Sequence, residues 1–235
     1  MSISPVTTHT DIVSEYFGGA IAALEAWRNE FVDDLREARA RGPVTTDALD
    51  ALVAPYAQRT FAVDLPVYGA GFIAALDSLA DARSHLAWWQ GIDRAQLVLA
   101  AQSVTKQHID YSELEWYRVP QQTGEAHVAG PYVDYLCSDE YTITVALPVL
   151  LDGAFAGVAG LDLLIDEVER DLTPRLALLG SDISVVNGIG RVLLSTSSWR
   201  ETGDSIRGDA RDGLTSFSCP GMALEIVQGP DAGRG

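Results

Sequence analysis

The stretch EYTITVALPVLLDGAFAGVAGLDLL, residues 140–164, decides the fold that we predict for this chain. From Tyr141 to Leu147, large apolar residues alternate with smaller or polar ones, which is typical of a β-strand with one buried face. Asp152-Gly153 then separates this run from a second apolar run, residues 155–163. Asp-Gly between two apolar runs is a strong signal for a β-hairpin. The stretch therefore predicts two long antiparallel strands joined by a tight turn.

The sequence after this hairpin predicts one more helix and a second group of strands. Residues 165–179 predict a helix that is broken near Pro174, and Gly180 is a common residue at a helix end. Asn187-Gly188 predicts a second hairpin turn. A final strand candidate, MALEIVQ, follows the polar residues 197–213, which predict a loop.

The N-terminal third predicts helices. Residues 8–40 contain no proline, and apolar side chains recur at steps of three and four, which predicts an amphipathic helix of unusual length. A second helix is predicted over residues 47–59, kinked or shortened by Pro55. Three short apolar runs then predict strands: VYGAGFIAAL, HLAWW and AQLVLAA. Helices followed by hairpin-linked strands predict an α+β fold, with helices packed on an antiparallel sheet.

Composition limits the partners that we expect. The 235 residues carry a formal net charge of -17, and such a surface repels phosphate backbones and anionic lipids but attracts cations. We therefore expect no nucleic-acid and no membrane partner. The N-terminus lacks a basic start followed by an apolar core, and the apolar runs are too short or interrupted to span a bilayer, so we expect a cytoplasmic protein. Cys137 and Cys219 predict buried free thiols, with a disulfide as the alternative in an oxidising compartment.

Residues 110–162 combine many aromatic side chains with interleaved carboxylates. A cationic ligand needs this combination, because ring faces attract a cation and a carboxylate neutralises it in a partly desolvated pocket. Aromatic clusters are also common in protein cores, so the residues alone leave both interpretations open. The candidate ligand-binding residues are Tyr111, Trp116, Tyr117, Tyr132, Asp134 and Asp162.

The order of short motifs in this region resembles the Cache family of PAS-like sensor domains, in its double Cache branch. The motifs are Trp116-Tyr117, the GPYVD segment at 130–134, Thr144, Pro148-Val149 and the GVAGLD segment at 157–162. The resemblance covers about residues 61–172 and implies a ligand-binding sensor domain. In amino-acid-binding members, the positions matching Trp116, Tyr117, Tyr132, Asp134 and Asp162 surround the ligand, and several hold its ammonium group.

The resemblance also implies a domain division. Residues 1–60 form an N-terminal helical segment that packs on the sensor domain, and residues 61–180 form the Cache ligand-binding domain. Residues 181–228 supply C-terminal strands, which are either a reduced second Cache module or the end of the first. Residues 229–235 form a disordered tail.

Two departures from the family's pattern shift the expected ligand. Amino-acid binders carry an arginine, which clamps the ligand carboxylate, where this chain has Leu114, and an upstream tyrosine falls on Ile109, with Tyr111 close by. A buried carboxylate without a cationic partner is costly, so we expect a cationic amine: a polyamine, a biogenic amine or a quaternary ammonium. An amino acid is the alternative, with Arg118 as a substitute clamp. Of the adjacent Trp88 and Trp89, one is a candidate to line the pocket while the other packs.

Other classes of function have weaker signals. The four histidines have no metal-binding spacing, no nucleophile has a convincing histidine partner, and we expect no metal, no cofactor and no enzymatic activity. The alternatives are a small hydrolase or lyase using Asp134 and Asp162, and an interaction protein with a vestigial pocket. For a sensor, we expect residues 120–130 to close over the ligand as a loop, and an unknown signalling protein to respond. A homodimer through the N-terminal helix is one use for its apolar stripe.

Overall fold

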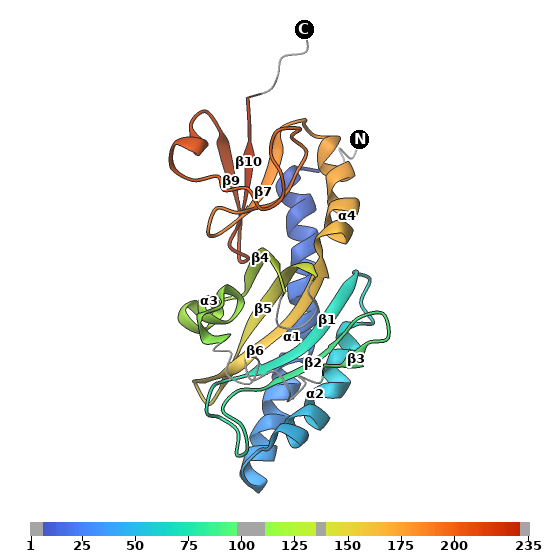
Figure 1. The fold of residues 1–235 in the computed structure, drawn as a ribbon, viewed down its shortest axis with the longest axis vertical. Helices are drawn as coiled ribbons and strands as arrows, with labels where there is room; N and C mark the ends of the chain where they lie inside the picture. Colours follow the sequence, from blue (N-terminus) through green and yellow to red (C-terminus); the bar gives the residue numbers. More distant parts are fainter. Residues whose placement is uncertain (1–6, 98–110, 135–139, 231–235) are drawn as a thin grey trace, which may run out of the picture.

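The computed structural model describes residues 7–97, 111–134 and 140–230, which form two antiparallel sheets arranged along one long helix (Figure 1). The helices are α1 (His9–Arg41), α2 (Thr46–Thr60), α3 (Glu115–Thr123) and α4 (Ile165–Ala177), with short 3-10 turns η2 (Tyr111–Glu113) and η3 (Gly208–Arg211). The strands are β1 (Val67–Ala74), β2 (Leu86–Gln90), β3 (Ala95–Gln96), β4 (His127–Val133), β5 (Tyr141–Leu151), β6 (Ala154–Leu164), β7 (Ile183–Asn187), β8 (Val192–Ser195), β9 (Thr215–Cys219) and β10 (Leu224–Gln228). The predicted α+β fold is confirmed.

The first sheet is built around the predicted β5–β6 hairpin. Its strand order is β3-β2-β1-β6-β5-β4, and every neighbouring pair is antiparallel. Leu151 pairs with Ala154 across a two-residue turn, in which Asp152 (φ 52°) and Gly153 (φ 82°) both take positive φ. Such a turn matches the twist of the flanking strands, and Asp-Gly tolerates it. The hairpin places two eleven-residue strands side by side at the centre of the sheet.

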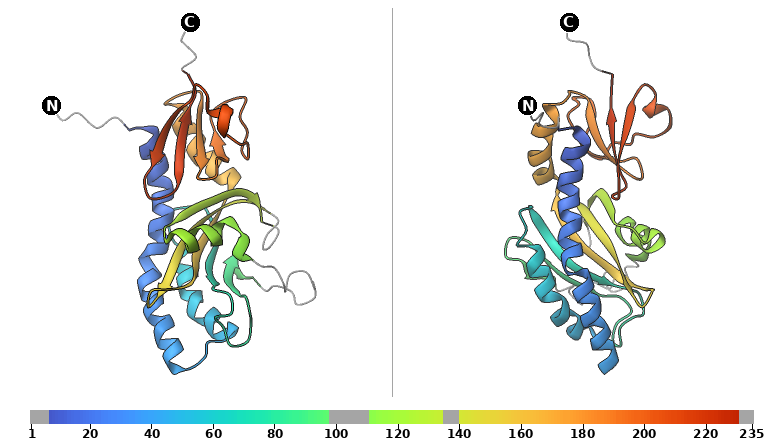
Figure 2. Two further views of the ribbon diagram at one scale, coloured as in Figure 1. Left: turned by 90° about the vertical axis from the view of Figure 1, so that its left-hand side faces the viewer. Right: turned by 180° about the vertical axis from the view of Figure 1, so that it is seen from behind.

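The long helix α1 packs on one face of this sheet, and α3 lies on the other (Figure 2). A capping box starts α1, because the Thr8 side chain accepts from the Asp11 N–H while the Asp11 side chain accepts from the Thr8 N–H. The buried stripe of α1 joins a core that includes residues of both sheets, such as Val145 in β5 and Leu224 in β10. The stripe is therefore covered by the chain's own core, and the predicted homodimer would need another face of the helix.

Three details of the sequence-based prediction change. The helix α2 runs through Pro55 to Thr60, and α4 runs through Pro174 to Ala177, so neither proline ends its helix. Residues 120–130 are not a loop: they belong to the end of α3, a short turn and the start of β4. In the described part of the chain, no helix has both the length and the apolar character to cross a bilayer.

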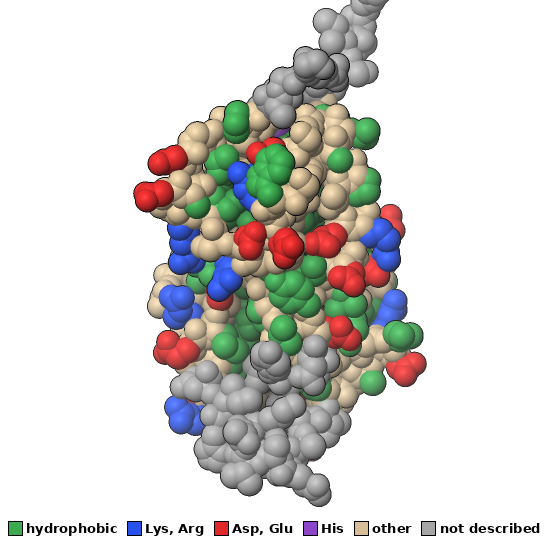
Figure 3. Space-filling view, turned by 45° about the horizontal axis from the view of Figure 1, so that its top comes forward, with side chains coloured by type: hydrophobic (Ala, Val, Ile, Leu, Met, Phe, Trp, Pro, Cys, Tyr) green, Lys and Arg blue, Asp and Glu red, His purple; other side chains and the backbone are tan. Residues whose placement is uncertain are grey.

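The surface is strongly acidic, as the net charge of -17 requires. A row of Asp and Glu side chains crosses the middle of the face drawn in Figure 3, with apolar side chains on both sides of it. Most ion pairs between described residues lie on exposed side chains, such as Arg41 with Glu37. Exposed pairs of this kind contribute little to stability, so the acidic surface bears on what the molecule attracts more than on its fold.

The second sheet, in the order β8-β7-β10-β9, is formed by the C-terminal strands. The predicted hairpin turn at Asn187-Gly188 is confirmed, because β7 and β8 pair antiparallel on its two sides, and the turn is longer than two residues. Three residues, 188–190, connect β7 to Arg191, and Gly190 takes the positive φ of 78°. The cause is the Asn187 side chain, whose Oδ1 accepts from the N–H groups of Ile189 (3.1 Å) and Arg191 (2.9 Å).

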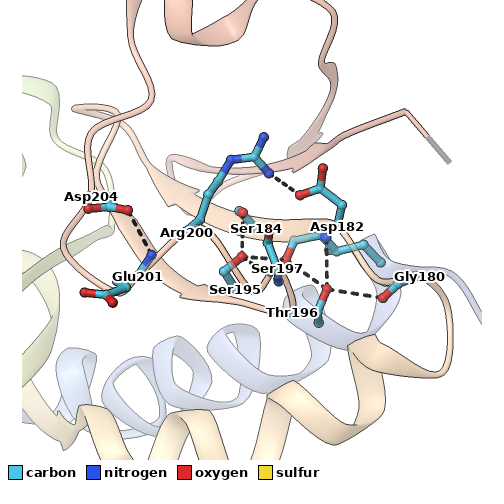
Figure 4. A network of polar contacts seen from close by, with 10 residues as sticks. Gly180, Asp182, Ser184, Ser195, Thr196, Ser197, Arg200, Glu201 and Asp204 are labelled. Atoms are coloured by element: carbon cyan, nitrogen blue, oxygen red, sulfur yellow. Dashed lines mark hydrogen bonds and ion pairs between the residues drawn. The ribbon is translucent and has the colours of Figure 1, made fainter. Parts of the chain in front are cut away.

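Hydroxyl groups hold the other end of the β7–β8 pair together (Figure 4). Ser184 and Ser195 share a hydrogen bond of 2.9 Å, and the Ser195 hydroxyl also accepts from the N–H of Ser197 (3.0 Å). The Thr196 hydroxyl accepts from the Ile183 N–H at 3.0 Å. These contacts hold the start of the segment 197–213 in place. The sequence predicts a loop for this segment, and the structure has the short helix η3 within it. Whether this sheet is a reduced second Cache module stays a prediction.

Candidate sensor pocket

A small cavity lies between the first sheet and α3. Its volume is about 20 Å³, which is room for roughly one water molecule. Trp116 of α3 covers it, and the other lining residues come from the sheet and the end of β4: Ile73, Leu86, Trp88, Tyr132, Asp134, Thr144 and Asp162. Because these residues come from five strands and one helix, the cavity depends on the fold of the whole sheet.

The strand register brings the polar lining together. Thr144 of β5 lies directly opposite Asp162 of β6, and its hydroxyl donates to the Asp162 carboxylate (Oδ1) at 2.5 Å. The Tyr132 hydroxyl shares a short hydrogen bond with the same Thr144 hydroxyl. Since Thr144 uses its one proton on Asp162, Tyr132 is the donor in that bond. The three side chains form a chain of hydrogen bonds that runs from Tyr132 through Thr144 to the Asp162 carboxylate.

Asp162 and Asp134 are both buried, with 5% and 6% of their surface exposed. Burial and, to a smaller extent, the negative charge of Asp134 raise the pKa of Asp162 to about 8, against the Thr144 hydrogen bond, which lowers it. A carboxyl group with this pKa is mostly protonated at neutral pH. Two buried carboxyl groups on one cavity are an arrangement that a positive charge stabilises, because it offsets both the burial and the repulsion.

Part of the chain is similar to a family of sensor domains. Residues 91–170 match the family described as the first PDC sensor domain of methyl-accepting chemotaxis protein-like proteins. Over these residues the chain is similar to a PDC, Cache-like sensor domain. No curated protein matches the sequence.

Solved structures agree with the PDC fold at low sequence identity. The ligand-binding domain of the Pseudomonas fluorescens chemoreceptor CtaA, in complex with L-valine, is 14% identical, with a TM-score of 0.64 over 96% of this chain and 94% of that one. The same CtaA domain with L-isoleucine has a TM-score of 0.61 at 14% identity, over 95% and 88% of the two chains. The ligand-binding domain of the Pseudomonas aeruginosa PAO1 amino acid chemoreceptor PctC, in complex with GABA, has a TM-score of 0.50 at 14% identity, over 93% and 94%.

The cavity contains four of the six residues singled out from the sequence. Trp116, Tyr132, Asp134 and Asp162 line the cavity. Tyr117 packs behind Trp116, edge-on to the Phe155 ring with centroids 5.3 Å apart. The Tyr111 hydroxyl donates to the Ala74 carbonyl (2.8 Å) and accepts from the His85 N–H (3.1 Å), which ties β1 to the start of β2. Tyr111 and Tyr117 therefore support the wall of the cavity, and the ligand-binding roles of all six stay predictions.

Four lining residues were not candidates from the sequence or were left unassigned: Ile73, Leu86, Trp88 and Thr144. Trp88 and Trp89 do point to opposite faces, and it is Trp88 that lines the cavity while Trp89 joins the core under α1 and α2. Thr144 was part of the motif string, but its contact with Asp162 depends on strand register. Because side chains alternate between the two faces along β2, only one of the two tryptophans could face the pocket. The alternation does not indicate which face of the sheet holds the pocket.

The described lining contains no basic side chain. Leu114, at the position of the family's arginine, is the N-cap residue directly before α3 and packs in the apolar cluster around Trp116. Arg118, the expected substitute, is not among the described lining residues, and its guanidinium donates to Gln122 one turn further along α3 (3.4 Å). Ile109 lies outside the described residues. A ligand carboxylate would thus need a neutral donor among the described side chains.

Proposed function

We propose that this PDC domain binds a small ligand through its ammonium group, with Asp162 and Asp134 as the counter-charges and the Trp116 ring against the cation. The observation that carries the proposal is the pair of buried carboxyl groups on one cavity, with the pKa of Asp162 raised to about 8. A bound ammonium would relieve the cost of both charges. The ring face adds a cation–π attraction.

An amino acid is the ligand class that we propose first. The CtaA domain holds L-valine or L-isoleucine, and the PctC domain holds GABA, and each of these ligands carries an ammonium group. These neighbours favour an amino acid over the simple cationic amine that Leu114 led us to expect. A cationic amine remains the second candidate, since the described lining has no basic side chain for a carboxylate.

Binding without chemical change is part of the proposal. The competing hypothesis is a small hydrolase or lyase in which Asp134 and Asp162 act as acid and base. Prolonged incubation of the purified protein with each bound ligand, followed by mass spectrometry, separates the two. We expect the ligand to be recovered intact, and turnover that Asp134→Asn abolishes would favour the enzyme.

A binding screen tests the main proposal. L-valine, L-isoleucine, GABA and a set of amines are compared by thermal shift and then by isothermal titration calorimetry. We expect at least one ammonium-bearing ligand to raise the melting temperature, and Asp162→Asn to remove the response. Asp93→Asn, at an exposed turn between β2 and β3, is the matched control and should respond like the wild type. If no such ligand binds, or if Asp162→Asn binds equally well, the proposal is wrong.

Because a cavity of about 20 Å³ is far smaller than a usual ligand pocket, binding must move its lining apart. We propose that this movement shifts the balance between two conformations, to which an unidentified signalling protein responds. We also propose a cytoplasmic location for this chain, which cell fractionation with a specific antibody tests.

A further inference from the structure

Trp88 lies across the sheet as the floor of the cavity. Glycines on β1, the neighbouring strand, and on β6, the strand beyond it, make room for its ring. A Cβ atom at Gly69 of β1 would come within 2.8 Å of the indole Nε1, and one at Gly160 of β6 would lie 3.4 Å from the far edge of the ring. Since the strand order is β2-β1-β6, the indole extends from β2 over β1 and reaches β6. Only 3% of the residue is exposed.

The indole N–H of Trp88 is fully buried and has no hydrogen-bond acceptor among the described residues. Buried donors in native proteins are nearly always paired, so an unpaired one calls for an explanation. Trp27 shows the usual solution in this same chain: its buried indole N–H donates to the Thr60 hydroxyl at 3.0 Å. If Trp88 had only a packing role, we would expect its indole N–H to have an acceptor, as in Trp27, or a phenylalanine to stand in its place.

The position of this N–H points to the ligand. Gly69, which lies under the indole nitrogen, pairs in register with Asp162 across β1 and β6, and Trp88 and Asp162 both line the cavity. The indole nitrogen therefore lies on the side of the ring that is nearer to the paired residues Gly69 and Asp162. A ligand ammonium on Asp162 would bring atoms only a few bonds away to the indole N–H. An ammonium itself cannot serve this donor, because it accepts no hydrogen bond.

We propose that the Trp88 indole N–H donates a hydrogen bond to an acceptor group of the ligand, a few bonds from its ammonium. Trp88 is then a specificity-determining residue, and the ligand class is an amino acid or another ammonium compound with a nearby carboxylate, carbonyl or hydroxyl. This inference rests on the proposed binding of an ammonium group. It also explains how a carboxylate is held where the described lining has no basic side chain. An alkylamine or quaternary ammonium leaves the donor unpaired, and such buried donors discriminate strongly.

Matched ligands and one conservative variant test the proposal. L-valine is compared with isobutylamine, and GABA with n-propylamine; each amine lacks only the carboxylate. Titration calorimetry should show tighter binding of the amino acid in a pair that binds. Trp88→Phe keeps an aromatic floor but removes the donor. It should weaken the amino acid on the order of tenfold, the loss of one hydrogen bond to a charged group, and leave the amine within about twofold.

The wild-type protein gives a second readout that a packing role would not move. In a 15N-labelled sample, the indole N–H signal of Trp88 should shift downfield with the amino acid and much less with its matched amine. Equal weakening of both ligands by Trp88→Phe, or an indole shift of the same size for both, overturns the role of Trp88 while the binding proposal stands. If neither class of ligand binds the wild type, both proposals fall. Should Trp88→Phe not fold, the indole shift in the wild type decides.

Discussion

Asp162 sets the charge of the pocket, and its raised pKa predicts how stability depends on pH. The folded pKa of about 8 exceeds the ordinary value of 3.8. Between these pH values the folded state holds a proton that the unfolded state has lost. The free energy of unfolding from this group therefore falls as pH rises from about 4 to 8, by up to about 1.4 kcal/mol per pH unit, and is constant below that window.

We expect Asp162→Asn to raise the melting temperature more at pH 8 than at pH 5, because the amide keeps an acceptor for Thr144 and carries no buried charge. Differential scanning calorimetry at both pH values measures the effect. Asp93→Asn, which removes an exposed charge, should give a small change that does not grow with pH. An equal gain from Asp162→Asn at both pH values would contradict the raised pKa.

Ligand binding should respond to the same proton. A bound ammonium favours the ionised carboxylate, so below pH 8 binding an ammonium releases a proton from Asp162. The Kd should fall as pH rises from 6 to 8, by up to about tenfold per pH unit. Calorimetry at one pH in phosphate and in Tris should give different apparent enthalpies because of the released proton. Affinity that stays flat over this range would argue against Asp162 as the counter-charge.

The single hydroxyl of Thr144 hydrogen-bonds to two side chains, Asp162 and Tyr132. The substitution Thr144→Val removes this hydroxyl, and both side chains lose the hydrogen bond to it. We expect a loss of about 1–3 kcal/mol in the free energy of unfolding. The pKa of Asp162 should rise further, because the Thr144 hydrogen bond lowers it. Thr144→Ser keeps the hydroxyl and should lose less in urea denaturation; if the two variants are equal, the hydroxyl is not the cause.

At the scale of elements, the last residue of β7, Asn187, contacts both α3 and β4. The Asn187 amide donates to the Gly130 carbonyl of β4 (2.5 Å) and reaches the Glu115 carboxylate at the start of α3 (3.4 Å). Glu115 and Gly130 adjoin the Trp116 and GPYVD motifs. This one side chain therefore joins the second sheet to the two segments that carry most of the candidate ligand-binding residues.

Asn187→Asp separates the two roles of this side chain. It keeps the oxygen that accepts from Ile189 and Arg191, but it replaces the donor that faces Gly130 with a second acceptor. We expect a loss of about 1–3 kcal/mol in stability and a change in ligand affinity. Asn187→Ala should lose the turn contacts as well. Stability is measured by urea denaturation and affinity by calorimetry; an unchanged affinity in both variants would leave the turn with a structural role alone.

The elements that depend on local pattern could be predicted from the sequence. The long helix and the β5–β6 hairpin follow from apolar periodicity and from Asp152-Gly153, which act over a few residues. The helix α3 was missed because it is short and contains Pro120, so its pattern is that of a loop. The hairpin at Asn187-Gly188 could also be predicted, but its length depends on side-chain contacts of Asn187 that the Asn-Gly pair does not indicate.

Only those pocket residues that belong to the short sequence motifs could be predicted from the sequence. Trp116, Tyr132, Asp134 and Asp162 lie within one stretch of the sequence, and the fold brings them to one cavity. Trp88 lies well outside that stretch and reaches the pocket through strand pairing, which no local pattern determines. Tyr117 failed to reach the cavity because it follows Trp116 on a helix, where adjacent residues point about 100° apart.

At the scale of the whole molecule, the two sheets share one core through α1. Phe17 of α1, Val145 of β5 and Leu224 of β10 belong to a single buried cluster. We therefore expect one cooperative unfolding transition, seen alike by far-ultraviolet circular dichroism and tryptophan fluorescence. Leu224→Ala should lower the midpoint of that whole transition, as Val145→Ala does, with a cost of about 2–5 kcal/mol for the leucine. Two separate transitions would show that the sheets unfold independently.

The length of α1 has a mechanical consequence. Its 33 residues make a rod about 50 Å long that rests on the first sheet at one part and on the second sheet at another. A rod of this length is a lever arm: a tilt of about 5° at one end displaces the other by about 4 Å. A shift too small to alter the fold of the first sheet would thus be magnified at the far end of the molecule.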